Sequence, residues 1–164
     1  MKRLRSFPPV SNEHATILIL GSMPGKESLR QSQYYAHPSN AFWKIMGELT
    51  GAHPSLPYAE RLRMLKSSGI ALWDVLDSCD REGSLDSDIR NESANDFAAF
   101  FAKHPYIKQV FFNGAKAEQS FRKFVLEQQT LPPLALQRLP STSPAHAGMR
   151  YEDKLQTWKI AIKP

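Results

Sequence analysis

The chain has 164 residues, a hydrophobic fraction of 41% and a net charge of +5. This length suffices for one domain with its own core, and no apolar run approaches the roughly 18 residues of a membrane span. Met1 is not followed by an apolar signal segment, and the single cysteine, Cys79, excludes an intrachain disulfide and four-cysteine metal sites. We therefore expect one domain over residues 1–164, monomeric and intracellular, in the cytoplasm.

The charges are unevenly distributed. Residues 74–96 contain eight acids against Arg81 and Arg90, a local charge of −6, so the rest of the chain carries +11. Such segregation is expected if one face meets a polyanion while an acidic face is turned away. A basic protein without such a partner is the open alternative.

The first half of the chain begins with a strand. Residues 15–20 are rich in β-forming residues and end at Gly21, which predicts a buried strand. A helix is predicted from Ser39 or Asn40 to about Gly51. Its apolar residues recur at helical spacing: Phe42, Ile45, Met46 and Leu49.

The middle of the chain adds a helix, a strand and a polar stretch. Pro57 can begin the second helix and Gly69 can end it, and residues 70–76 read as the next strand. Residues 77–95 are polar and rich in acids, which predicts a long loop. Asn95 is predicted to cap the helix that follows.

The last part continues the alternation. Strands are predicted over residues 107–112 and 134–139, helices over 113–128 and 151–162, and a loop over 140–148. Strands that alternate with helices predict a three-layer α/β/α sandwich around a mostly parallel four-stranded sheet. Ligands of such folds bind at the carboxyl ends of the strands.

The turn after the first strand reads "GSMPG" and precedes Lys26. A phosphate-binding loop needs four residues between its glycines and a Ser or Thr after the lysine, whereas here three intervene and Glu27 follows. A turn of this kind can still present backbone N–H groups to an anion or a carbonyl oxygen. A purely structural turn is the alternative.

The stretch "YYAHPSNAFW" combines aromatic and hydrogen-bonding groups. Tyr34 and Tyr35 do not follow a helical period, so a planar ligand could stack there. His37 and Asn40 bring polar groups nearby, and the Asn40 amide can both donate and accept. Taken alone, an Asn at this place is more often a helix cap than a catalytic group.

The loop "STSPAHAG" is small and polar, with hydroxyls at Ser141, Thr142 and Ser143 and an imidazole at His146. It could bind a ligand or only connect two elements. No Gly-x-Ser-x-Gly elbow occurs, and the five histidines are not paired with acids at ligand spacing. We expect no metal and no cofactor.

These three strings, "LILGSMPG", "YYAHPSNAFW" and "STSPAHAG", resemble the uracil-DNA glycosylase superfamily, and within it the hypoxanthine-DNA glycosylase (DNA-deoxyinosine glycosylase) branch. The similarity runs over residues 15–162 and includes "IALWDVLDSCDREGSLDSDI" and "VFFNGAKA". The string "HPSNAFW" is also similar to the mismatch-specific branch. The resemblance implies a uracil-DNA glycosylase-like fold and a repair enzyme acting on double-stranded DNA with a damaged or mismatched base.

The resemblance also implies site residues. Asn40 would be catalytic and orient the attacking water through its side-chain carbonyl, and Tyr35 would stack on the everted base. The other base-binding residues would be Gly21, Ser22, Met23, Pro24, Gly25 and Asn113. The DNA-binding residues would be His37, Ser141, Thr142, Ser143 and His146.

The chain departs from the pattern of its relatives in three places. Met23 stands where the mismatch-specific branch has a catalytic Asn, Ser141 where the best-studied uracil enzymes have a catalytic His, and Ala145 where a bulky wedge is expected. These losses argue against strict uracil specificity and against flipping driven by a wedge residue. The branch that the chain resembles implies hypoxanthine as the first substrate, with uracil and G/T or G/U mismatches as further candidates.

The implied reaction is hydrolysis of the N-glycosidic bond of a flipped-out base, leaving an abasic site without strand cleavage. Asp74 and Asp77 could activate water or be solvated loop acids. Two other functions stay open on the sequence: a non-catalytic module that binds nucleic acid or nucleotides, and a hydrolase of free nucleosides.

Overall fold

The computed structural model describes residues 3–164, and its centre is a four-stranded parallel sheet. The strands are β2 (Ile17–Gly21), β3 (Ile70–Asp74), β6 (Gln109–Asn113) and β7 (Ala135–Leu139), in the order β3-β2-β6-β7. All neighbouring strands pair in parallel, so their carboxyl ends meet at one edge. The predicted sheet is confirmed.

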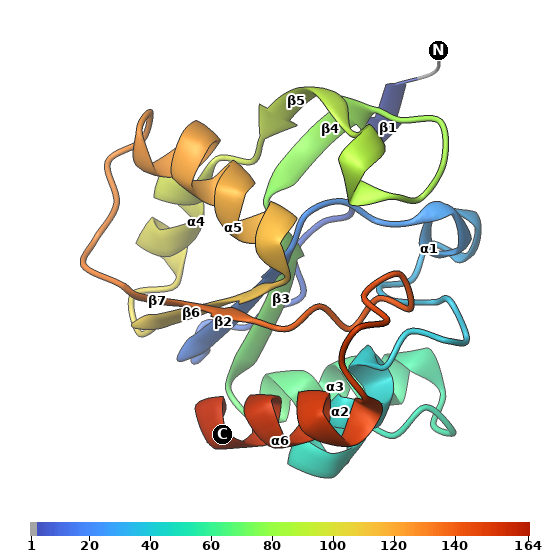
Figure 1. Ribbon diagram of the computed structural model, residues 1–164. Coiled ribbons are helices and arrows are strands. Elements are labelled where there is room, and N and C mark those ends of the chain that lie inside the picture. The colour runs from blue at the N-terminus through green and yellow to red at the C-terminus, as the bar shows by residue number, and fades with distance from the viewer. Residues whose placement is uncertain (1–2) are drawn as a thin grey trace.

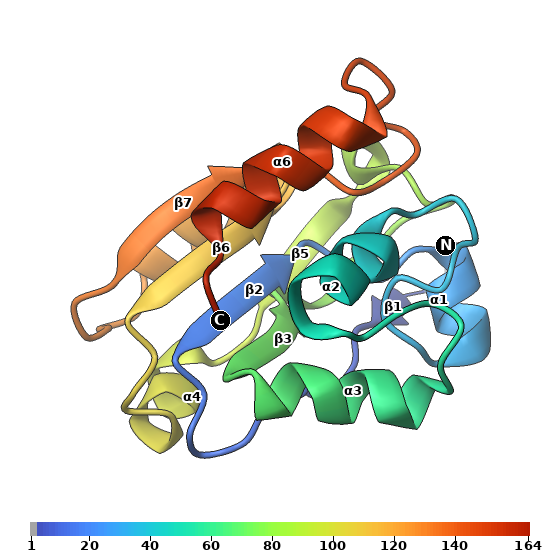
Figure 2. The same ribbon diagram turned by 90° about the horizontal axis from the view of Figure 1, so that it is seen from below.

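Helices cover both faces of this sheet (Figure 1). One face packs against α2 (Phe42–Thr50), α3 (Tyr58–Ser67) and α6 (Tyr151–Ala161), which lie in front of the strands in Figure 2. The other face packs against α4 (Phe97–Lys103) and α5 (Ala115–Phe121), which continues into a wider π-helical turn at Arg122–Leu126. The predicted three-layer sandwich is therefore confirmed.

Alternation along the buried strands explains why both faces are apolar. In β2, Ile17 and Ile19 join the cluster beneath α2, α3 and α6, whereas Leu18 and Leu20 join the cluster beneath α4 and α5. None of the helices within residues 3–164 combines the length and the apolar composition needed to cross a membrane.

The loop expected over residues 77–95 is wrong. This stretch supplies β4 (Leu76–Asp80) and β5 (Arg90–Ala94), which pair antiparallel with each other and, through β4, with β1 (Arg3–Arg5). The acids of β4 led to the prediction of a loop. In the structure, Asp77 and Asp80 form ion pairs of 3.5 and 3.6 Å with arginines of β1. A distant partner neutralises charges that look unfavourable for a strand.

The strand expected over residues 70–76 divides at Asp74. β3 ends there and β4 begins at Leu76, although the Val75 and Leu76 N–H groups still donate to the carbonyls of Gly21 and Ser22 at the end of β2.

Helix starts also differ in detail. Asp96, rather than Asn95, caps α4 by accepting a hydrogen bond from Ala99 N–H at 3.1 Å. The Asn95 amide instead donates to the Asp74 carbonyl at 2.8 Å. The short helix α1 (Lys26–Gln31) was not expected from the sequence.

Gly114 joins β6 to α5 with φ +95°, and a Cβ there would lie 3.0 Å from Cβ of Ser141. Because an L side chain is strained at this φ, Gly114→Ala is expected to lower the free energy of unfolding by about 1–3 kcal/mol. Urea denaturation measures this loss. Gly148→Ala is the matched control, since a Cβ there meets no atom within 4 Å, and equal losses in the two variants would contradict this role of Gly114.

Candidate active site

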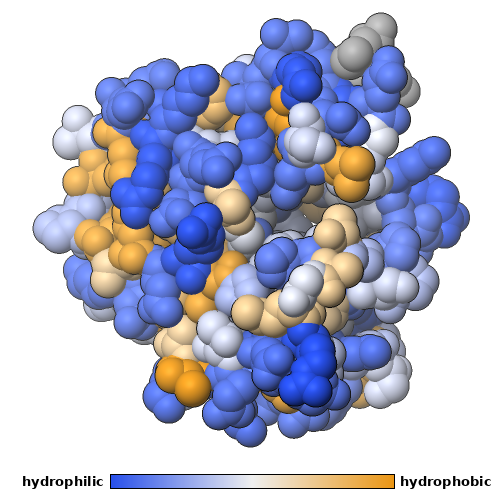
Figure 3. Space-filling model, viewed as in Figure 1, coloured by the Kyte–Doolittle hydropathy of each residue, from blue (hydrophilic) through white to orange (hydrophobic). Residues whose placement is uncertain are grey.

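A cavity of about 730 Å³ opens at the carboxyl edge of the parallel sheet, at the hollow near the middle of Figure 3. This volume is in the range of small-molecule sites. The structure brings together in it every site residue named from the sequence: Gly21, Ser22, Met23, Pro24, Gly25, Tyr35, His37, Asn40, Asn113, Ser141, Thr142, Ser143 and His146.

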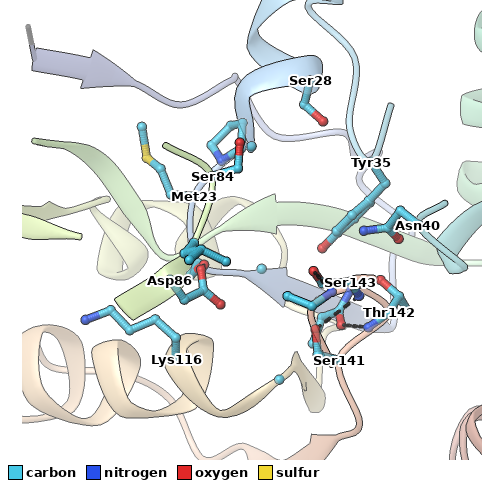
Figure 4. Close-up of a pocket in the computed structure, with 18 of the residues that line it drawn as sticks. Met23, Ser28, Tyr35, Asn40, Ser84, Asp86, Lys116, Ser141, Thr142 and Ser143 are labelled. Carbon is cyan, nitrogen blue, oxygen red and sulfur yellow. Dashed lines mark hydrogen bonds between the residues drawn. The ribbon is translucent and has the colours of Figure 1, made fainter. Parts of the chain in front are cut away.

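Asn40 lies just before α2 and is half-buried. Its Oδ1 accepts a hydrogen bond from the Phe42 backbone N–H at 2.9 Å. Because this bond determines which amide atom faces the helix, the amide nitrogen is turned toward Tyr35 and the cavity (Figure 4). Asn40 thus bonds to the first N–H of α2 and also lines the cavity, while the N-cap position itself is Ala41. The carbonyl that was expected to orient water is partly engaged by this bond.

The adjacent tyrosines have different environments. Tyr34 belongs to the core, where its hydroxyl donates to the Pro8 carbonyl at 2.9 Å. Tyr35, at φ +53°, stacks one ring face on Phe42 with centroids 4.1 Å apart. Its hydroxyl points into the cavity (Figure 4). Tyr35 therefore presents its hydroxyl and only one ring face to a ligand.

Asn113 and Thr142 tie the 141–146 loop to the sheet. The Asn113 amide donates to the Thr142 hydroxyl at 3.0 Å and accepts the Thr142 N–H at 2.9 Å. The Thr142 carbonyl accepts from Ala41 N–H at 3.0 Å. Thr142 is buried and its hydroxyl is occupied, so it positions the loop, while Ser141, Ser143 and His146 remain accessible at the mouth.

The turn after β2 is clamped by the segment between β4 and β5. The Ser22 hydroxyl donates to Asp86 at 2.6 Å, and the guanidinium of Arg81 donates to the carbonyls of Pro24 and Gly83. The Met23 side chain packs in the core beneath α4 and α5. Met23 thus offers the cavity little beyond its backbone.

The acidic segment is not turned away from the cavity, contrary to the expectation from charge. Asp74 and Asp86 both line it, together with Lys26, Arg90 and Lys116. The sequence did not single out these three cations. They surround the opening because the turn after β2, the start of α5 and the segment before β5 converge there.

Asp74, the last residue of β3, is a buried acid that the sequence left undecided. Its exposed fraction is 3%, so the interpretation as a solvated loop acid is wrong. Its pKa is raised to about 7, chiefly by burial and also by the Asp86 carboxylate, while Arg81 opposes the shift. Asp77 is half-buried and paired with Arg5. The signal available in the sequence was that Asp74 directly ends an apolar strand.

Comparison with known proteins agrees with this geometry. Residues 8–162 match the family model described as the uracil DNA glycosylase superfamily. A protein of Methanosarcina barkeri (strain Fusaro) named hypoxanthine DNA glycosylase is 45% identical over 114 residues, covering 69% of this chain and 72% of the relative. One of the same name from Methanosarcina acetivorans is 42% identical over 132 residues, covering 78% and 84%.

A solved structure is also similar. It is a solution NMR structure of a Methanosarcina acetivorans protein assigned provisionally as a uracil DNA glycosylase. It matches with a TM-score of 0.81 and 35% identity, covering 97% of this chain and 96% of that one. Since the family model spans nearly the whole chain and the fold agrees, this protein belongs to the uracil DNA glycosylase superfamily.

Proposed function

We propose that this protein is a monofunctional DNA glycosylase that removes deaminated bases, hypoxanthine foremost, from double-stranded DNA and leaves an abasic site. The observation that supports this most strongly is the position of Asn40, whose amide faces a cavity large enough for a purine. The relatives named hypoxanthine DNA glycosylase support the same substrate. The enzyme acts inside the cell, as a monomer.

The target base lies inside the duplex and has to be flipped out before it can reach the cavity. The energy of this step is smallest for a poorly paired base such as hypoxanthine. Around the mouth, Ser141, Ser143, His37 and His146 are placed to contact flanking phosphates. Lysine and arginine side chains at the rim add affinity that depends on salt and not on sequence.

Asn40 positions the attacking water. Its Oδ1 keeps a second lone pair beyond the bond from Phe42, and Nδ2 carries two N–H donors, so the amide can hold a water against the anomeric carbon. An amide is a poor proton acceptor, so rate acceleration comes from positioning and from electrostatic stabilisation of charge on the sugar and the departing base. No covalent intermediate is required.

Labelled duplexes containing one deoxyinosine, one deoxyuridine or one G·T mismatch test this function. We expect the deoxyinosine duplex to break after alkali treatment and not before it, and we expect mass spectrometry to detect free hypoxanthine. Retention of the duplex without base release indicates a binding module instead, and turnover of free inosine with little response to salt indicates a nucleoside hydrolase. Either result overturns the proposal.

A further inference from the structure

Two polar side chains border one small space on the inner wall of the cavity. Gly21 and Asp74 are register partners at the ends of β2 and β3. A Cβ on Gly21 would lie 2.6 Å from Oδ1 of Asp74 and 2.7 Å from the hydroxyl oxygen of Tyr35. A side chain at position 21 would therefore clash with both oxygens, and the glycine is what allows the Asp74 carboxyl and the Tyr35 hydroxyl to approach the end of β2 so closely. All three residues line the cavity.

Both side chains also have a buried oxygen without a partner. Within residues 3–164, neither Oδ2 of Asp74 nor the hydroxyl oxygen of Tyr35 has a hydrogen-bond partner, although both atoms are buried. The Ser22 hydroxyl is already bonded to Asp86, and the Asn113 amide is bonded to Thr142. The second N–H of the Asn113 amide lies beside the Tyr35 hydroxyl and can only donate to it, so among the residues that the structure describes the hydroxyl proton and the Asp74 oxygen both stay without a partner. Buried polar groups are normally satisfied, so this pair points to a bound group that completes it.

The chemistry of the pair selects the kind of group. A tyrosine hydroxyl can donate, and a carboxyl keeps an accepting oxygen in either protonation state. Deamination converts the amidine edge of adenine or cytosine, a ring nitrogen acceptor beside an amino donor, into a lactam edge with a ring N–H donor beside a carbonyl acceptor. Hypoxanthine and uracil share this edge.

We propose that Asp74 and Tyr35 read the lactam edge of the everted base, with Asp74 accepting the ring N–H and Tyr35 donating to the carbonyl oxygen. This assignment rests on the proposed glycosylase function and makes both residues specificity determinants. With Asp74 ionised, an adenine in the same position would direct its ring nitrogen lone pair at the carboxylate. A protonated Asp74 would donate to that nitrogen instead, so this discrimination belongs to the ionised form. A site built around such hydrogen bonds discriminates strongly against an analogue that lacks them.

The test compares deoxyinosine with deoxynebularine, a purine nucleotide without the 6-oxygen and the N1–H. Single-turnover release of each base is measured for the wild-type protein and for Asp74→Ala. The rate on deoxyinosine is expected to fall at least about tenfold in the variant, while the rate on deoxynebularine changes less than about twofold. Comparing variant with wild type on each substrate cancels the intrinsic reactivity of the two bases.

Three further variants sharpen the comparison. Asp74→Asn retains an accepting oxygen and is expected to restore most of the preference for deoxyinosine. Tyr35→Phe removes one oxygen that has no partner in the protein, so it preserves the fold and is expected to weaken deoxyinosine selectively. Asp77→Asn is the matched control outside the cavity, and it is expected to behave as wild type.

If Asp74→Ala and Tyr35→Phe each lower the rates on deoxyinosine and deoxynebularine equally, the two residues do not recognise the lactam edge. Unchanged rates in both variants overturn the proposal as well. Equilibrium binding of the two duplexes is measured in parallel. If the wild-type protein prefers the deoxyinosine duplex, loses this preference in Asp74→Ala and releases no base, the result overturns the glycosylase function. The same result supports recognition of the lactam edge by Asp74.

Discussion

Asn40→Ala is expected to reduce single-turnover release of hypoxanthine by roughly 10²–10³-fold, the effect of removing one preorganised polar group from a reaction centre. The reason is the placement of the amide, which faces the cavity and is held there by the Phe42 N–H. Alkaline cleavage of a labelled deoxyinosine duplex under enzyme excess gives the rate.

The loss has to be separated from the structural role of the same side chain. Asn40→Ala also removes the hydrogen bond that Oδ1 accepts from the Phe42 N–H at the start of α2, at a cost of about 1 kcal/mol of stability. Asn40→Ser is the matched control, because a serine hydroxyl can accept from the same N–H but carries no amide. We expect Asn40→Ser to keep the stability and still lose the rate, and Ser39→Ala to retain both. An undiminished rate in Asn40→Ser would show that the amide does not act in the chemistry.

Asp74→Asn is expected to stabilise the protein increasingly as pH rises. Burial raises the pKa of Asp74 from 3.8 to about 7, so between these values the folded protein binds a proton that the unfolded chain has lost. The free energy of unfolding of the wild type therefore falls with rising pH through this window. Relative to wild type, the variant should gain roughly 2–3 kcal/mol between pH 5 and pH 8.

Urea denaturation at several pH values, with both proteins in the same buffers, measures this gain. Asp86 and Arg81, which act on the same carboxyl in opposite directions, are present in both proteins, so the difference isolates Asp74. A stability difference that is constant from pH 5 to pH 8 would contradict the raised pKa.

A buried acid that lowers stability near neutral pH is best explained by function. A core optimised only for stability would place an apolar or a fully hydrogen-bonded side chain there. Asp74 instead lies opposite Gly21 in a cavity, where a bound lactam edge would supply the missing bond. The cost in stability is the expected counterpart of a site prepared for its ligand.

The sequence predicted the parallel sheet because three of its strands, β2, β3 and β6, contain continuous apolar runs that need no distant partner to be recognised. The same reasoning failed for β4 and β5. The acids of β4 pair with arginines of β1, which lies more than seventy residues earlier, and β5 is largely exposed and, among the described strands, pairs only with β4. The sequence of a polar strand in a small antiparallel sheet resembles that of a loop when its partner strand is distant in the chain.

The residues of the site were largely predictable, but their individual environments were not. Strand ends and the family motifs correctly grouped Asn40, Tyr35 and the 141–146 loop in one cavity. The burial of Asp74 and the internal bonds of Thr142 arise from contacts between segments far apart in the chain. Such contacts determine pKa and accessibility, and no local pattern encodes them.

The position of the everted base is tested most directly by a crystal structure of the protein bound to a duplex containing 2′-fluoroarabino-deoxyinosine, whose fluorine slows hydrolysis. The base is predicted to lie in the cavity, with N1 within hydrogen-bond distance of the Asp74 carboxyl and the anomeric carbon facing the Asn40 amide. A hypoxanthine that remains stacked in the duplex, or that is bound away from Asp74 and Asn40, would contradict the proposed site.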